Sequence, residues 1–530
     1  MKKLLFLISM FSLVFTAGIA SAEGITLTDD EMKQAKKMYF DRCAGCHGTL
    51  RKGATGPNLE PAKTTALTTD GLKVFIEFGT PGGMPAWKDQ LSEQEIDLMA
   101  RFLQVTPPTP PEMSLADMKA TWKVIVPVKD RPTKPMHKRN IDNFFGVILR
   151  DAGKVAIIDG DTKETVGIVD TGFAVHILRS SASGRYFYSI GRDAKATLID
   201  LWMEKPTVVA EVKVGAEARS IEVSKFHDKK ADYRDKYAII GDYWPPQFII
   251  VDGLTLEPIK VVSTRSMTYD TNEYHPEPRV AAIITSHNAP EWMLNIKETG
   301  YIWIVDYSDI KNMKITQLEA ERFLHDGGWA NKRYFLMAAN MRNKLVVVDT
   351  VEKKVAAIVE VGNKPHPGRG ANWVDPEFGP VYATPHLGEP ALALVGTDPK
   401  GHPKEAWKMV RKIPVLAAGG LFVKTHQKSN HVWVDSTLDS VADNTRTLTV
   451  IDKKNPEAPF KTIKVADKGR VVHMEYNKDG NEVWVSVWDK NGEIVIYDDK
   501  TLKEKKRITG DWLVTPTGKF NMWNTVHDIY

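Results

Sequence analysis

The sequence predicts a mixed fold, in which a small all-α domain (about residues 23–105) precedes an all-β, eight-bladed propeller (residues 117–530). Three observations support this prediction. Apolar residues at helical spacing are confined to the first hundred residues, a proline-rich stretch follows them, and a strand pattern then recurs eight times. A chain of 530 residues is also too long for one ordinary core, so two or more domains are expected.

The N-terminus has the pattern of a secretory signal peptide, residues 1–22. Two lysines precede a mostly apolar run over residues 4–19, and the small residues Ala20-Ser21-Ala22 follow. We therefore expect the mature chain to begin at Glu23 and to reside in a bacterial periplasm or an equivalent compartment. No later apolar run is long enough to span a bilayer.

The charge balance argues against nucleic acid as a partner. The formal net charge is +4, and loss of Lys2 and Lys3 with the signal would lower it to about +2. Basic residues are matched by acidic ones along the chain, so no basic patch stands out.

Three short helices are predicted in the first domain. Thr28 and Glu31 form a capping-box pattern at the start of one helix, and Ser92 with Glu95 repeats it at the start of another. Between them, Thr69-Asp70 precedes an apolar run over residues 72–76. The last helix carries apolar residues at helical spacing, among them Met99.

Between the first two predicted helices lies Cys43-Ala44-Gly45-Cys46-His47, the spacing of a covalent c-type haem site. The two thiols would form thioethers to the porphyrin, and His47 would ligate the iron. A zinc site would require further thiol or imidazole ligands, but the chain has only these two cysteines. A structural disulfide would not require the adjacent histidine. Haem c therefore makes this a cytochrome c domain.

A sixth iron ligand is offered by the loop at residues 79–87, where glycines and prolines surround Met84. A thioether ligand would raise the haem potential. The alternative is that Met84 only packs in the core, as Met99 is expected to do on its helix.

Prolines at positions 107, 108, 110 and 111 mark a stiff linker over residues 106–116. Beyond it, short apolar runs end in Asp or Gly about every 40 to 56 residues, close to the length of a propeller blade. Eight such runs favour an eight-bladed propeller over an open array of β-sandwiches. The runs end at Asp159, Asp200, Asp252, Asp306, Asp349, Gly396, Asp452 and Asp498.

Within the propeller, three histidines are candidates for chemistry. His325 precedes a glycine pair, His366 is held between two prolines, and His176 lies in a strand-like run. Each is equally open to interpretation as a hydrogen-bonded structural histidine. Arginines also recur near the predicted blade ends, and they suit either a large acidic ligand or surface ion pairs. They are Arg150, Arg179, Arg192, Arg219 and Arg369.

Taken together, these segments resemble the cytochrome cd1 nitrite reductase family of periplasmic denitrification enzymes, over nearly the whole mature chain. The matching motifs include CAGCHGTLRKGATG (residues 43–56), ARSIE (218–222), YWPPQ (243–247), EYHPEPRVAA (273–282), FLHDGG (323–328), HPGRGAN (366–372) and LVTPTGKFN (513–521).

The resemblance implies two cofactors per chain. Covalent haem c would be bound by Cys43 and Cys46, with His47 and Met84 on its iron. Non-covalent haem d1 would lie on the propeller axis, with His176 as its proximal ligand and His325 and His366 as the distal catalytic pair. The residues implied to contact haem d1 are Arg150, Arg179, Arg192, Arg219, Ser220, Tyr243, Ala281, Arg369, Phe422, His473 and Gly518.

The implied reaction is the one-electron reduction of nitrite to nitric oxide and water at haem d1, with oxygen reduction to water as a side activity. Electrons would pass through haem c from a soluble periplasmic donor, a small cytochrome c or a cupredoxin, and the enzyme would be a homodimer. Two features depart from the family pattern. No tyrosine precedes Tyr39, whereas certain members carry a tyrosine on an N-terminal arm, and His473 stands where glutamine is common.

Three other functions are compatible with part of this sequence pattern. A dehydrogenase that completes haem d1 synthesis shares both domains, but His325 and His366 with their flanking motifs favour the reductase. A quinohaemoprotein alcohol dehydrogenase typically uses a vicinal cysteine pair, and this chain has no third cysteine. A non-enzymatic electron carrier would lack the second chromophore.

Overall fold

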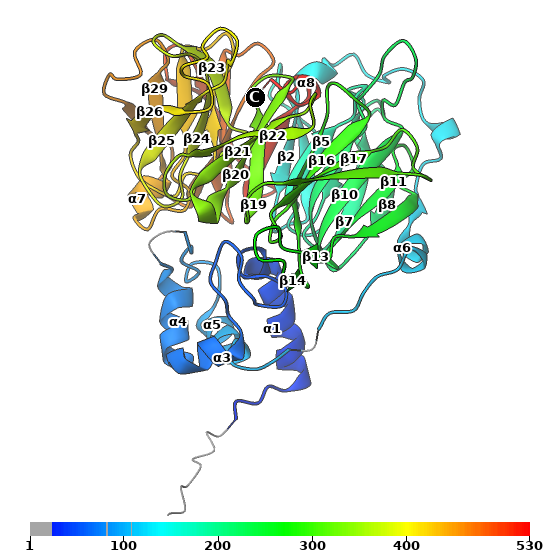
Figure 1. Ribbon diagram of the computed structural model, residues 1–530, viewed down its shortest axis with the longest axis vertical. Coiled ribbons are helices and arrows are strands. Elements are labelled where there is room, and N and C mark those ends of the chain that lie inside the picture. The colour runs from blue at the N-terminus through cyan, green and yellow to red at the C-terminus, as the bar shows by residue number, and fades with distance from the viewer. Residues whose placement is uncertain (1–23, 81–82, 108, 530) are drawn as a thin grey trace, which may run out of the picture.

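The computed structural model describes residues 24–80, 83–107 and 109–529 (Figure 1). The predicted signal peptide and Glu23 lie outside these residues. The predicted mixed fold is confirmed, because within the described residues six α-helices precede eight sheets of four or five strands. Figure 1 shows α1, α3, α4 and α5 gathered at one end of the propeller. In the described part of the chain, no helix combines the length and apolar character needed to cross a bilayer.

The main helices of the helical region begin close to where the sequence predicts. Both predicted capping boxes are present: the Thr28 hydroxyl accepts a hydrogen bond from the Glu31 N–H, and Ser92 accepts one from Glu95. The short helix at the CxxCH motif was not predicted. The helices are α1 (Asp29–Arg42), α2 (Ala44–His47), α3 (Pro61–Thr64), α4 (Thr68–Phe78) and α5 (Glu93–Phe102).

Eight antiparallel sheets form the blades. The first combines β35 (Pro516–Asn521) with β2 (Phe144–Leu149), β3 (Lys154–Asp159) and β4 (Thr165–Asp170). The next two sheets are β5 (Ile177–Ser180), β6 (Tyr186–Ile190), β7 (Lys195–Asp200) and β8 (Thr207–Lys213), and then β9 (Glu217–Val223), β10 (Tyr237–Trp244), β11 (Gln247–Asp252) and β12 (Pro258–Ser263). The fourth sheet contains β15 (Val280–Thr285), β16 (Glu291–Ile296), β17 (Tyr301–Asp306) and β18 (Lys314–Glu319). The fifth contains β19 (Leu324–Trp329), β20 (Tyr334–Ala339), β21 (Lys344–Asp349) and β22 (Lys354–Glu360).

The last three sheets are β23 (Ala371–Asp375), β24 (Gly379–Pro385), β25 (Ala391–Gly396) and β26 (Met409–Pro414); β27 (Val423–Lys424), β28 (His431–Val434), β29 (Thr447–Asp452) and β30 (Lys461–Lys464); and β31 (Arg470–Tyr476), β32 (Glu482–Trp488), β33 (Glu493–Asp498) and β34 (Glu504–Ile508). A separate hairpin joins β13 (Ser266–Met267) to β14 (Tyr274–His275), and short helices α7 (Ala442–Thr445) and α8 (Met522–His527) complete the chain.

The ring of blades is closed by the C-terminal strand. β35 pairs with β2 near the start of the propeller, with Asn521 opposite Phe145. Asn521 Nδ2 also donates to Asn143 Oδ1 at 3.1 Å. One blade therefore contains both ends of the propeller, and this pairing protects strand edges that would otherwise be open.

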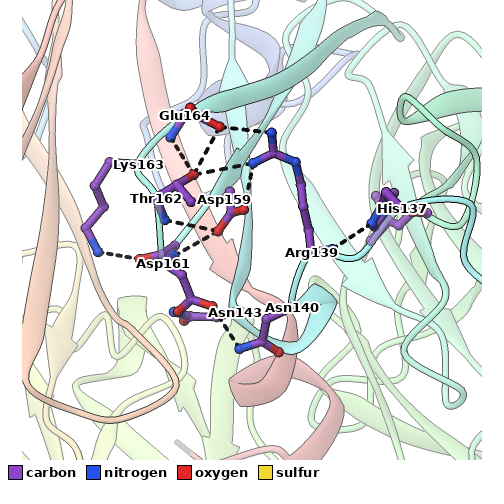
Figure 2. Close-up of polar contacts among 11 residues, drawn as sticks. His137, Arg139, Asn140, Asn143, Asp159, Asp161, Thr162, Lys163 and Glu164 are labelled. Carbon is purple, nitrogen blue, oxygen red and sulfur yellow. Dashed lines mark hydrogen bonds and ion pairs between the residues drawn. The ribbon is translucent and has the colours of Figure 1, made fainter.

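The eight predicted apolar runs all lie in the corresponding strand of their blades: β3, β7, β11, β17, β21, β25, β29 and β33. The aspartate that ends most of them has a turn-forming role, shown in Figure 2 for Asp159. Asp159 Oδ1 accepts from the Asp161 and Thr162 N–H groups, and Oδ2 accepts from Arg139. The side chain thus caps the β3–β4 turn, which is why an apolar strand ends in a carboxylate.

The predicted linker contains the start of a helix. Helix α6 (Leu115–Thr121) begins one residue before the predicted end of the linker at residue 116, and the chain then adds β1 (Lys123–Val124) to the edge of β8. Trp244 Nε1 donates to the Pro110 carbonyl at 3.1 Å, so the proline segment is held against the propeller.

Candidate functional site

The CxxCH motif is arranged as a haem c site requires. Cys43 and Cys46 are both free thiols. His47 is buried, and its Nδ1 lies 2.9 Å from the Pro57 carbonyl, which leaves Nε2 for a metal. A side chain at Gly56 would collide with the His47 ring, so this glycine leaves space for the imidazole.

Met84 lies in the loop that follows α4. Its backbone pairs with Thr80, whose N–H donates to the Met84 carbonyl at 3.0 Å. The side chain is half-buried against the core of the helical region, whereas Met99 is fully buried within that core. The iron ligation by Met84 therefore stays a prediction.

The haem c motif faces the propeller. Arg279, which lies just before β15, donates to the Ala44 carbonyl at 3.2 Å. Glu277 accepts from the N–H groups of Thr49 and Leu50, at 2.5 and 3.0 Å. These contacts join the segment that carries the haem-binding cysteines directly to the propeller.

Within the propeller, most predicted residues lie on or shortly before the first strand of a sheet, which is β35 in the first blade, whereas Arg150, Arg192 and Tyr243 lie at the ends of second strands. Most of these first strands lie against the corresponding strand of the next sheet, around the axis. In five of them the ladder is irregular at or next to a predicted residue, namely Arg219, Ala281, His325, His473 and Gly518. Bulges of this kind re-aim side chains near functional sites.

His325 and His366 lie together, with ring centroids 4.9 Å apart and planes nearly perpendicular. Arg219 Nη2 is 3.3 Å from His325 Nε2. Burial and the charges of Lys297 and Arg219 hold the pKa of His325 well below its ordinary value. The Phe422 ring lies beside His366 on one side and His473 on the other.

His176 directly precedes β5, and its side chain is exposed, although protein atoms surround it on many sides. This enclosure, together with Arg219, Arg192 and Arg150, holds the pKa of His176 well below its ordinary value. A neutral imidazole surrounded by guanidinium groups suits a metal ligand beneath an acidic macrocycle.

The other predicted arginines fall into two groups. Arg179 and Arg369 share one buried carboxylate, because Glu222 Oε2 lies 3.1 Å from Arg179 Nε and 3.5 Å from Arg369 Nη2. Arg150 and Arg192 lie toward the helical region, where Arg150 donates to the Asp41 carbonyl and Arg192 contacts Gly45.

The donor set fits an anionic macrocycle. Among the described residues, Tyr243 Oη, His325 Nδ1 and Arg192 Nε are buried without a hydrogen-bond partner in the protein. Such groups are costly unless a ligand satisfies them. Ser220, in contrast, has a partner within the protein: its hydroxyl accepts a hydrogen bond from the Ile283 N–H and so links β9 to β15.

Sequence reasoning missed several residues of this region. Lys297 and Lys519 are fully buried, and burial lowers the pKa of each to about 7. Asp326 and Glu222 contact the predicted histidines and arginines directly. Both residues lie within family motifs, FLHDGG for Asp326 and ARSIE for Glu222, but only the fold shows what their carboxylates contact.

Two family models match the chain. One described as the cytochrome D1 heme domain matches residues 139–525, and one described as cytochrome C oxidase, cbb3-type, subunit III matches residues 30–103. The chain is 51% identical to "Nitrite reductase" of Stutzerimonas stutzeri, over 97% of this chain and 96% of that protein.

More distant relatives share the architecture. "Dihydro-heme d1 dehydrogenase" of Pseudomonas aeruginosa is 26% identical, over 92% of this chain and 93% of that protein. The solved structure "Dihydro-heme d1 dehydrogenase NirN in complex with DHE" is also 26% identical, covers 93% of this chain and 100% of its own, and has a TM-score of 0.70.

Proposed function

The chain belongs to the cytochrome cd1 nitrite reductases, with haem c and haem d1 as cofactors, and we propose that its reduction of nitrite is a one-electron step that yields nitric oxide and water. The observation that carries this proposal is the pair His325 and His366, whose ring centroids are 4.9 Å apart, with Arg219 Nη2 3.3 Å from His325 Nε2. Two imidazoles at this separation suit a small anion that must accept protons.

The reaction consumes one electron and two protons per nitrite, and an N–O bond breaks to release water. Haem d1, when bound, supplies the electron and the iron that holds nitrite. Arg219 and the two imidazoles attract and orient the anion, since positive charge and N–H groups stabilise it in an enclosed site. The distal pair also provides the proton transfer to the departing oxygen.

The remaining cofactor contacts are proposals of the same kind. His176 would ligate the d1 iron, and Cys43, Cys46, His47 and Met84 would hold haem c. Around haem d1, the macrocycle contacts are Arg150, Arg179, Arg192, Arg219, Ser220, Tyr243, Ala281, Arg369, Phe422, His473 and Gly518. The unpartnered Tyr243 Oη and Arg192 Nε support this assignment.

Electrons reach haem d1 through haem c from a soluble donor, a small cytochrome c or a cupredoxin. The N-terminal sequence supports a periplasmic location. Resemblance to the family supports a homodimer, and oxygen reduction to water is the proposed side activity.

The test compares wild-type enzyme with His325→Gln and His366→Gln. With a reduced donor, wild type should convert nitrite to nitric oxide in equal amount. Each variant should lose roughly 10²–10⁴-fold in turnover because proton transfer is impaired, while extracted haem d1 stays at the wild-type level. Wild-type enzyme that oxidises only a dihydro-haem d1 precursor would instead identify a cofactor-maturing dehydrogenase.

A further inference from the structure

Asp326 links the two distal histidines. It follows His325 in β19, at the irregularity of the ladder between Leu324 and Gly327. Its Oδ2 lies 3.4 Å from His366 Nδ1 and accepts from the Gly368 N–H at 2.7 Å. One carboxylate therefore contacts the second histidine and also fixes the backbone two residues beyond it.

The tautomer of His366 follows from these contacts. His366 Nδ1 lies 3.0 Å from the Leu421 carbonyl, which can only accept a hydrogen bond. Nδ1 must therefore carry a hydrogen, shared between Leu421 and the Asp326 carboxylate. Any proton that His366 gives to a substrate comes from Nε2, and Asp326 stabilises the cationic ring that holds this proton.

His325 is surrounded by groups of the opposite charge to Asp326. Its Nε2 faces Arg219, which can only donate, and Lys297 is the nearest source of further positive charge. Both cations disfavour an imidazolium at His325. The two distal histidines therefore lie in different electrostatic environments, because His325 faces cations and His366 faces a carboxylate.

We propose that Asp326 is a positioning residue that makes His366 the proton donor of the distal pair and leaves His325 neutral. This inference rests on the proposed function. In the step concerned, His366 Nε2–H⁺ gives its proton to a nitrite oxygen, a second proton from solvent completes water, and the N–O bond breaks as nitrogen gains the one electron that haem d1 would supply. His366 is left neutral with its hydrogen on Nδ1, still bound to Leu421 and Asp326.

The groups that face this pair come from several elements. Arg219 lies on β9, Lys297 follows β16, and His176 precedes β5. Tyr382 of β24 is buried near Asp326, which contributes to raising the pKa of that phenol. Burial raises the pKa of Asp326 itself, and the positive charges of His366, Arg219 and Lys297 act against this effect.

The test uses the carbon monoxide complex of the reduced holoenzyme, whose C–O infrared stretch responds to the charge of nearby groups. Titration from about pH 5 to about pH 9 brackets imidazole protonation. In wild type we expect one step in the band position, and in His366→Gln no step. Asp326→Asn should move the midpoint down by about one pH unit or more, because an opposite charge has been removed. Its side-chain oxygen still accepts from Gly368, so folding should be retained.

Two matched variants separate charge from structure. Asp326→Glu keeps the charge and should keep the wild-type midpoint even if the Gly368 contact is lost. Asp200→Asn removes a buried carboxylate paired with Arg185 in another blade, and should leave the midpoint unchanged. A wild-type midpoint in Asp326→Asn, a step that persists in His366→Gln, or a wild-type band without any step would each overturn the proposal. If wild type fails to make nitric oxide but the Asp326→Asn shift appears, only the proposed function fails.

Discussion

Arg279 Nη1 donates to the Ala44 carbonyl at 3.2 Å, so a propeller guanidinium binds the backbone between the two haem-binding cysteines. The same guanidinium lies 4.7 Å from the centre of the Tyr243 ring, and the Arg219 guanidinium lies 5.7 Å from the same centre. A continuous series of contacts therefore runs from the CxxCH segment through Arg279, Tyr243 and Arg219 to His325.

Arg279→Lys should slow electron transfer from haem c to haem d1. Glu298 pairs with Arg279 at 2.6 Å, and a lysine retains this charge pairing but not the planar fork that reaches Ala44. We expect the transfer rate in stopped-flow reduction to fall about tenfold, with both haems retained, since a shift of about 1 Å at a positioned group is costly. An unchanged rate would show that this contact does not set the docking of the two redox centres.

Gly45→Ala should disturb the same interface from the other side. A Cβ at this position would collide with the Arg192 guanidinium, which is held by Glu217. We expect slower electron transfer and a domain contact that opens at lower denaturant, as overpacking typically costs about 1–3 kcal/mol. Gly71→Ala is the matched control: it lies in α4 of the same region, and its nearest neighbour would be Thr68 Oγ1 at 3.7 Å. If Gly45→Ala and Gly71→Ala have the same electron-transfer rate and the same denaturant sensitivity, the proposed role of the Gly45 contact is refuted.

Glu277 should make the folded state pH-dependent. Burial raises its pKa to about 7, although Arg279 and the Leu50 and Thr49 N–H groups act against this. The folded protein therefore binds a proton as pH falls through 7, before the unfolded chain does near its ordinary value. This contribution to stability is present at low pH and is lost as pH rises toward 7 and above.

Glu277→Gln removes this titration. Relative to wild type, the variant should gain about 2–3 kcal/mol in free energy of unfolding between pH 5 and pH 8. Guanidinium denaturation of both proteins at the two pH values measures the difference, and the same offset at each pH would refute the assignment.

The sequence predicts the parts of this molecule whose signals are local. Capping boxes, the CxxCH spacing and the eight apolar runs each lie within a few consecutive residues, and all appear in the structure as predicted. That the first strands of the blades lie in a ring could be inferred only because propellers in general have this arrangement. The contact of Glu277 with Thr49, 228 positions earlier, could not be inferred, because no short-range pattern encodes it.

The same limit applies to the site. The flanking motifs indicate His325 and His366, but they do not indicate Asp326, although it is adjacent to His325. Its role depends on a loop about forty residues later and on the Leu421 carbonyl, which reaches His366 from a third blade. Charge relationships of this kind arise from the fold and not from residue type.

Met84→Ala should lower the reduction potential of haem c, because a thioether ligand stabilises reduced iron. The loop is held independently of the side chain: the Thr80 N–H binds the Met84 carbonyl, and Arg470 of the propeller donates to the Ala86 carbonyl at 3.2 Å. The variant should therefore fold and retain both haems. Redox titration of the haem c absorbance measures the change.

The control is Met99→Leu, which replaces a fully buried methionine of α5 by a residue of similar volume. It should leave the potential unchanged while testing the packing of the same core. If both variants shift the potential alike, Met84 acts through packing and another group completes the iron coordination. If only Met84→Ala does, the thioether is the ligand, and the driving force for reducing haem d1 depends on a loop that also contacts the propeller.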